Sequence, residues 1–315
     1  MKNFFKGFWQ VLKQSGIEFS NDNAIKLSAS LSYYTVFSIA PMLVVIISVC
    51  AIFFGKEAIQ GEVYGQIDGL IGKEAALQVQ ELIKNVQLSD KSFLATAIGL
   101  ITLLIGATGI FIEMQDSINF IWAIKAKPKK GWLKYLTNRL ISFALIGSLG
   151  FLLLVSLGIN ALLDALFNRI ERIFPDITAY LMYAANITVV LLVISTLFAI
   201  IFKVLPDGKL GWKEAFVGAG FTSVLFILGK FLIGLYLSKS DVASTYGSAS
   251  SLIILLLWVY YSSVILYFGA EFTKVYAALF GNKIIPNEYA VLVEKTEIHT
   301  DANNNKEEVK IPTVA

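Results

Sequence analysis

Apolar and polar residues follow one another along the chain in long blocks rather than at the short periods of a soluble fold. A helix needs about 20 apolar residues to cross a bilayer. Runs of at least that length occupy residues 27–55, 93–122, 140–163, 179–203, 212–237 and 248–280. The pattern therefore predicts an all-α, polytopic membrane bundle with six transmembrane helices, forming one domain over residues 27–280.

Three segments outside these runs carry their own pattern. Residues 1–26 place aromatic and aliphatic side chains on one helical side and lysines on the other, which predicts a helix lying in the membrane interface. A cap packed on the bundle is the alternative, and both can hold. Residues 56–92 are amphipathic and predict one or two short helices on the outer surface. Residues 281–315 turn polar, and we expect a cytosolic tail that is largely disordered.

The composition supports a membrane protein and argues against an enzyme. Only 16% of residues are charged, against about 25% in soluble domains. A single cysteine, Cys50, excludes an intramolecular disulfide, and a single histidine, His299, excludes a zinc site built from several histidines. The sequence shows no phosphate-cradling loop, nucleophile elbow or metal-ligand cluster. We therefore expect no enzymatic activity and no cofactor.

The distribution of basic residues predicts the orientation. Most of the Lys and Arg residues outside the spans lie in residues 1–26, 123–139, 203–213 and 281–315. The positive-inside rule places these segments, and with them both termini, in the cytosol. We interpret the basic segment 123–139 as a topology signal or a contact for anionic lipid rather than a nucleic-acid site.

Acidic residues inside the spans are the candidates for function. Glu113 and Asp116 lie with small residues in one sector of the second span, and lipid cannot solvate a carboxylate. That sector must face protein or trapped water, so it is either a packed polar seam or the wall of a binding cavity. Tyr267 and Glu271 share a face of the sixth span, and Arg139 is the expected partner of Asp116. These five residues predict a polar cavity that opens to the cytosol and is closed toward the outside.

Several stretches resemble the YihY/BrkB family of bacterial inner-membrane proteins. They are LSYYTVFSIAP (31–41), IGATGIFIEMQDSINFIW (105–122), FKVLPDGKLGW (202–212) and YGSASSLIILLLWVYYSSVILYFGAEFTKVYA (246–277). The resemblance implies six membrane helices with both ends cytosolic in the bacterial inner (plasma) membrane. The best-known member of the family is linked to serum resistance. Members were once labelled ribonuclease BN, and a transport role with lipid or ions as cargo has been suggested.

Two functions follow as expectations. The first is a transporter-like protein whose cavity takes a lipid, an amphipathic molecule or an ion, with membrane lipids as its surroundings and no nucleic-acid partner. The second is a non-transporting envelope protein that docks a partner through its outer amphipathic segment, residues 56–92.

Overall fold

The computed structural model describes residues 2–38, 77, 93–128, 131–171, 175–239, 250–294, 296–300 and 306–310. Most of the second half of the first predicted span and nearly all of the predicted outer segment, 56–92, therefore lie outside the described residues. The docking function that was assigned to that segment stays a prediction.

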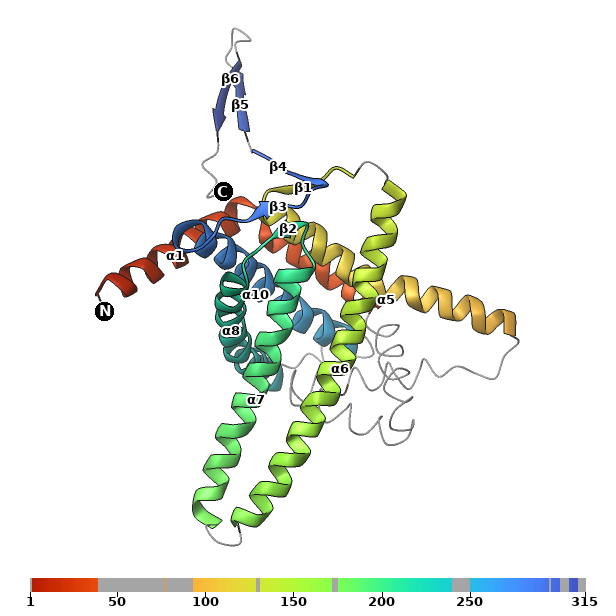
Figure 1. Cartoon of the computed structure of the whole chain (residues 1–315), viewed down its shortest axis with the longest axis vertical. Coiled ribbons are helices and arrows are strands. Elements are labelled where there is room, and N and C mark those ends of the chain that lie inside the picture. The colour runs from red at the N-terminus through yellow and green to blue at the C-terminus, as the bar shows by residue number, and fades with distance from the viewer. Residues whose placement is uncertain are drawn as a thin grey trace.

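Long helices make up most of the described chain (Figure 1). They are α1 (Lys2–Asn21), a second helix over residues 24–38, α5 (Phe93–Ile121), α6 (Gly131–Glu171), α7 (Pro175–Val204), α8 (Trp212–Lys239) and α10 (Ser250–Phe280). Among the described residues, four segments are long and apolar enough to cross a membrane: Gly131–Leu152, Ala184–Val204, Trp212–Leu237 and Leu252–Phe280. A helical protein with apolar spans is thus confirmed, whereas the count of six stays a prediction.

Short antiparallel strands make the fold differ from a purely helical bundle. β1 (Ile124–Ala126) pairs with β4 (Ala290–Leu292), and β2 (Gly208–Lys209) pairs with β3 (Ile285–Pro286). β5 (Thr296–Thr300) and β6 (Lys306–Lys310) form a hairpin. Figure 1 shows all six strands at one end of the bundle.

Part of the expected disordered tail is therefore ordered in strands. The polar composition of the tail did not indicate this order, because the contacts that hold the tail are backbone hydrogen bonds and one apolar side chain. The Val293 N–H donates to the carbonyl of Ala123 at 2.7 Å, and the Lys127 N–H donates to the carbonyl of Tyr289 at 2.7 Å. Ile284 packs against Gly208 in the turn between α7 and α8. These contacts use the backbone of a polar segment to tie together the loops that follow α5 and α7.

Paired glycines and threonines bring α8 and α10 close together. A Cβ atom on Gly218 of α8 would lie 1.9 Å from Thr273 Oγ1, and one on Gly269 of α10 would lie 2.0 Å from Thr222 Oγ1. Each threonine hydroxyl donates to a carbonyl of its own helix, Thr222 to Gly218 and Thr273 to Gly269, both at 2.7 Å. Each helix therefore fills the hollow that the glycine of the other leaves, which permits close backbone approach.

The N-terminal helix packs on the bundle. Val11 of α1 is 1% exposed and forms a buried cluster with Phe272 and Val275 of α10. On the other side of α1, the side chains of Trp9 and Ile17 are exposed. The alternative named in the sequence analysis, a helix packed as a cap on the bundle, is thus present. The placement of α1 in the membrane interface stays a prediction.

Candidate functional site

The polar side chains of α5 fall into two groups, buried amides and more exposed acids. Gln115 and Asn119 are buried, whereas Glu113 is half-buried and Asp116 is exposed. The two acids that the sequence singled out are therefore less enclosed than the amides beside them, which the sequence analysis overlooked.

Tyr267 of α10 lies opposite these acids. It is 0% exposed, and its hydroxyl oxygen has no hydrogen-bond partner within hydrogen-bonding geometry among the described residues. Ser117 is its nearest polar neighbour on α5, and Glu113 and Asp116 act on it electrostatically. Tyr267, Glu113 and Asp116 therefore lie close enough to interact, and their role in a common cavity stays a prediction. Arg139 is half-buried near the start of α6, and its pairing with Asp116 stays a prediction.

Glu271 belongs to a different group of side chains. It contacts Lys274 one turn further along α10, and Lys274 in turn reaches Glu18 of α1 and Asp22 in the turn after α1. The sequence analysis missed Glu18 and Asp22. The available signal was their spacing: Val11, Ser15, Glu18 and Asp22 recur at intervals of three and four residues, which places them on one helical face. That face is the one that packs on α10.

Asp207 joins the loop between α7 and α8 to α5. The Asp207 N–H donates to Asn119 Oδ1 at 2.8 Å, and Asn119 Nδ2 donates back to Asp207 Oδ2 at 3.0 Å. Gln115 Nε2 donates to Asp207 Oδ1 at 3.2 Å. The Asn287 N–H donates to the Asp207 carbonyl at 2.9 Å, which adds the segment after α10. The buried amides of α5 therefore hold a turn in place and are not open to a ligand.

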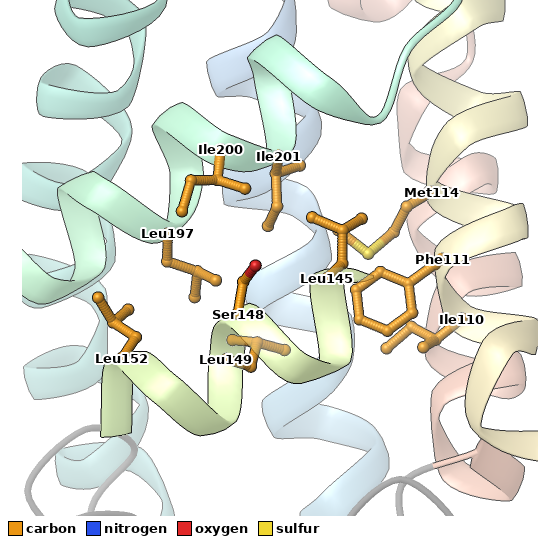
Figure 2. Close-up of a pocket in the computed structure, with 10 residues that line it drawn as sticks. All are labelled: Ile110, Phe111, Met114, Leu145, Ser148, Leu149, Leu152, Leu197, Ile200 and Ile201. Atoms are coloured by element: carbon orange, nitrogen blue, oxygen red, sulfur yellow. The ribbon is translucent and has the colours of Figure 1, made fainter. Parts of the chain in front are cut away.

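One cavity among the described residues is apolar. It measures about 160 Å³ and lies between α5, α6 and α7. Its lining consists of Ile110, Phe111, Met114, Leu145, Ser148, Leu149, Leu152, Leu197, Ile200 and Ile201 (Figure 2).

Ser148 carries the only side-chain oxygen in that lining, and its hydroxyl group already donates a hydrogen bond within α6. Ser148 Oγ donates to the Ala144 carbonyl at 2.8 Å. Phe111 and Met114 project from a different side of α5 than Glu113 and Asp116, and Ile110 lies between the two sides. The polar cavity of the sequence analysis thus remains a prediction. The structure instead shows an apolar cavity that the sequence did not reveal.

This arrangement suits apolar binding better than metal chemistry. Among the described residues, no group of three or more His, Cys, Asp or Glu side chains is placed to hold a metal ion. A cavity of about 150 Å³ lined by Leu, Ile and Phe stays dry and binds small apolar molecules. The cavity between α5, α6 and α7 has a similar volume and lining but is partly open, since Ser148 is exposed and Leu149 is half-buried.

Comparison with known proteins gives one consistent result. A sequence model described as "Virulence factor BrkB" matches residues 17–286. A UPF0761 membrane protein of Tolumonas auensis is 26% identical over 259 residues, which cover 80% of each chain. A UPF0761 membrane protein of Haemophilus influenzae is 25% identical over 86% of this chain and 94% of its own.

Other relatives are longer than this chain. A UPF0761 membrane protein of Psychrobacter sp. is 24% identical over 85% of this chain, but the match covers only 48% of that protein. No solved structure matches the chain.

Proposed function

Because the chain belongs to the BrkB virulence factor family of membrane proteins, we propose that it is transporter-like and that its cargo is a lipid or another amphipathic molecule. The observation that supports this proposal is the apolar cavity between α5, α6 and α7. An acyl chain is apolar along its length and gains free energy when its methylene groups leave water or replace empty space. A hydrated ion would gain nothing from such a lining.

Arg139 is suited to bind the other half of an amphipathic molecule. Arg139 precedes the lining residue Leu145 on α6 by six residues, about 9 Å along the helix axis. A guanidinium group binds phosphate or carboxylate through paired hydrogen bonds. In this proposal the cavity takes the tail of the cargo, and Arg139 takes an anionic headgroup.

The acids near Tyr267 have a proposed role on the side of α5 that does not line the apolar cavity. Glu113, Asp116 and Tyr267 form the polar side of α5 and α10, and the polar part of the cargo passes them. Glu113→Gln keeps the size and hydrogen-bonding capacity of the side chain and removes its charge. We expect this variant to insert normally and to lose transport.

The experiment is reconstitution in liposomes with a panel of fluorescent lipids and an ion-flux arm. Leu149→Trp adds volume inside the cavity, and we expect it to weaken lipid binding about tenfold, the effect of about 1.4 kcal/mol. Phe151→Trp is the matched control, because Phe151 lies on the same helix, is 67% exposed and is not part of the lining.

Equal lipid movement in the two tryptophan variants would contradict the role of the cavity. Ion flux without lipid movement would reject lipid as the cargo. A parent protein that moves neither lipid nor ions above the level of empty liposomes would reject transport itself.

A further inference from the structure

Four charged side chains form a buried group between α1 and the C-terminal part of α10. Lys274 Nζ lies 3.1 Å from Glu18 Oε2, 3.4 Å from Glu271 Oε2 and 3.9 Å from Asp22 Oδ2. The four side chains are at most 6% exposed. Figure 1 shows α1 lying against α10 at the end of the bundle that carries the strands. The apolar cavity between α5, α6 and α7 contains none of these residues.

The charges that act on Glu271 are unbalanced. Among the described residues, Lys274 is the one cation that contacts Glu271, and the same ammonium group also contacts the two acids Glu18 and Asp22. From α1, Gln14 contributes only its amide, which donates to Glu18 Oε1 at 3.0 Å. One turn earlier on α10, Tyr267 faces Ser117 and the acids of α5 instead. An ionised Glu271 would therefore be a fully buried carboxylate facing two acids and one ammonium group, which is costly in a low dielectric.

The hydrogen bonds of Glu271 show the same imbalance. Its Oε2 atom accepts from Lys274, but its Oε1 atom has no hydrogen-bond donor among the described residues, although Glu271 is 0% exposed. The carboxyl groups of Asp22 and Glu271 share one ammonium group, since Lys274 Nζ lies 3.9 Å from Asp22 Oδ2 and 3.4 Å from Glu271 Oε2. An ionised carboxylate can only accept hydrogen bonds, so two such groups cannot bond to each other. A protonated one carries an O–H donor.

We propose that Glu271 binds a proton and donates it as a hydrogen bond to the Asp22 carboxylate, so that the four side chains form a proton-binding site between α1 and α10. The ligand is a proton from the aqueous phase, and binding converts a carboxylate into a carboxylic acid without any other bond change. With the proton bound, both oxygens of Glu271 have partners: Lys274 at Oε2 and Asp22 at Oε1.

The site couples protonation to the position of the N-terminal helix. Loss of the proton leaves two carboxylates face to face in a buried position, and their repulsion separates α1 from α10. The apolar contacts of Val11 with Phe272 and Val275 oppose this separation. Docking of α1 is thus strongest with the proton bound. This inference stands independently of the transport proposal, because no cargo takes part in it.

Infrared spectroscopy of the purified full-length protein tests the site directly. A protonated carboxyl group gives a C=O band that is separate from the bands of carboxylates and shifts in D₂O. We expect this band at neutral pH in the parent protein. We expect it to be lost in Glu271→Gln and in Asp22→Asn, since each amide supplies an N–H donor in place of the proton.

The matched control is Glu214→Gln. Glu214 is 2% exposed, and its Oε1 atom accepts from the backbone and side-chain N–H groups of Asn282. It already has its donors and needs no proton, so the band should persist in this variant. A band of unchanged intensity in Glu271→Gln, or no such band in the parent, would overturn the proposal.

Thermal stability gives a second measurement that does not rely on spectroscopy. Gln can replace a protonated Glu271, because its NH₂ group donates to Asp22 and its carbonyl oxygen accepts from Lys274. The melting temperature of Glu271→Gln should therefore equal that of the parent at neutral pH. In alkaline buffer the parent should become less stable than this variant, because only the parent has a proton to lose at this site. If Glu271 is instead ionised, Gln breaks its ion pair with Lys274. A variant that is destabilised at neutral pH, or that fails to fold, therefore also contradicts the proposal.

Discussion

Asp207 shows how one buried residue can hold several loops together. Its backbone and carboxylate make four hydrogen bonds, to Gln115, Asn119 and Asn287. The partners come from α5 and from the segment after α10, while Asp207 itself lies in the short connection between α7 and α8. A buried carboxylate with amide donors on both oxygens is stabilising only while every partner is in place.

Removing the Asp207 carboxylate should therefore destabilise the protein more than neutralising it. Asp207→Ala leaves the buried N–H groups of Gln115 and Asn119 without an acceptor, at a cost of about 1–3 kcal/mol for each group. Asp207→Asn should cost less, because the Gln115 amide can turn over and accept from the new NH₂ group. Melting temperatures of the two variants in detergent measure the difference. Equal destabilisation would show that these hydrogen bonds matter little.

The sequence could not identify this network, and the reason is geometric. Gln115, Asn119 and Asp207 are each ordinary residues for a helix end or a turn, and the partners are about 90 positions apart. A helical wheel assigns residues to sectors, but it does not say which neighbour a sector faces. For the same reason, Glu271 was grouped with Tyr267 by shared face, whereas the structure gives the two residues different partners from different helices.

At the scale of helices, sequence pattern was more informative. α5, α8 and α10 begin and end within about two residues of the predicted spans, because an apolar block in a membrane can satisfy its backbone only as a helix. α6 extends well beyond its predicted span at both ends, since its outer turns are polar and hydropathy alone does not detect them. The close contact of α8 and α10 also has a sequence signal, the small residues Gly218 and Gly269. The threonines that fill the space beside these glycines give no such signal.

Filling one of those hollows should force α8 and α10 apart. Gly218→Ala places a methyl group against Thr273, and overpacking of this kind costs about 1–3 kcal/mol. Gly220→Ala is the control, because nothing lies within 4 Å of the new methyl group and alanine favours a helix over glycine by about 1 kcal/mol. In thermal unfolding, Gly218→Ala should lower the melting temperature and Gly220→Ala should raise it. Adding Thr273→Ala to Gly218→Ala should restore part of the lost stability.

At the scale of the whole molecule, the strands limit the possible topologies. β1 follows α5, β2 lies between α7 and α8, and β3 and β4 follow α10. The pairing of β1 with β4 and of β2 with β3 places these three connections on the same side of the bundle. Positive-inside counting grouped the same three segments, residues 123–139, 203–213 and 281–315, as cytosolic. The pairing supports the grouping, and the identity of the compartment stays a prediction.

Reporter fusions test that compartment. Fusions after Ala126 and after Ala302 should both report the cytosol, and a fusion within residues 56–92 should report the opposite side, because the basic residues outside the spans favour this orientation. A cytosolic signal from the fusion within residues 56–92 would reverse the predicted orientation of Arg139 and of the nearby apolar cavity.

The strand pairing also sets an order for biogenesis. Ile124 leaves the ribosome long before its ladder partner Leu292, and Gly208 before Pro286. Several contacts lack a partner until α10 and the segment after it have been synthesised. They are the edges of β1 and β2, the Trp122 indole N–H that donates to Ala270, and the Asp207 carbonyl that accepts from Asn287. A chain that stops before residue 285 therefore carries its apolar helices but exposes unpaired backbone on one surface, the kind of feature that quality-control proteases recognise. Synthesis of residues 285–292 should thus set the point at which the nascent protein becomes protected from degradation.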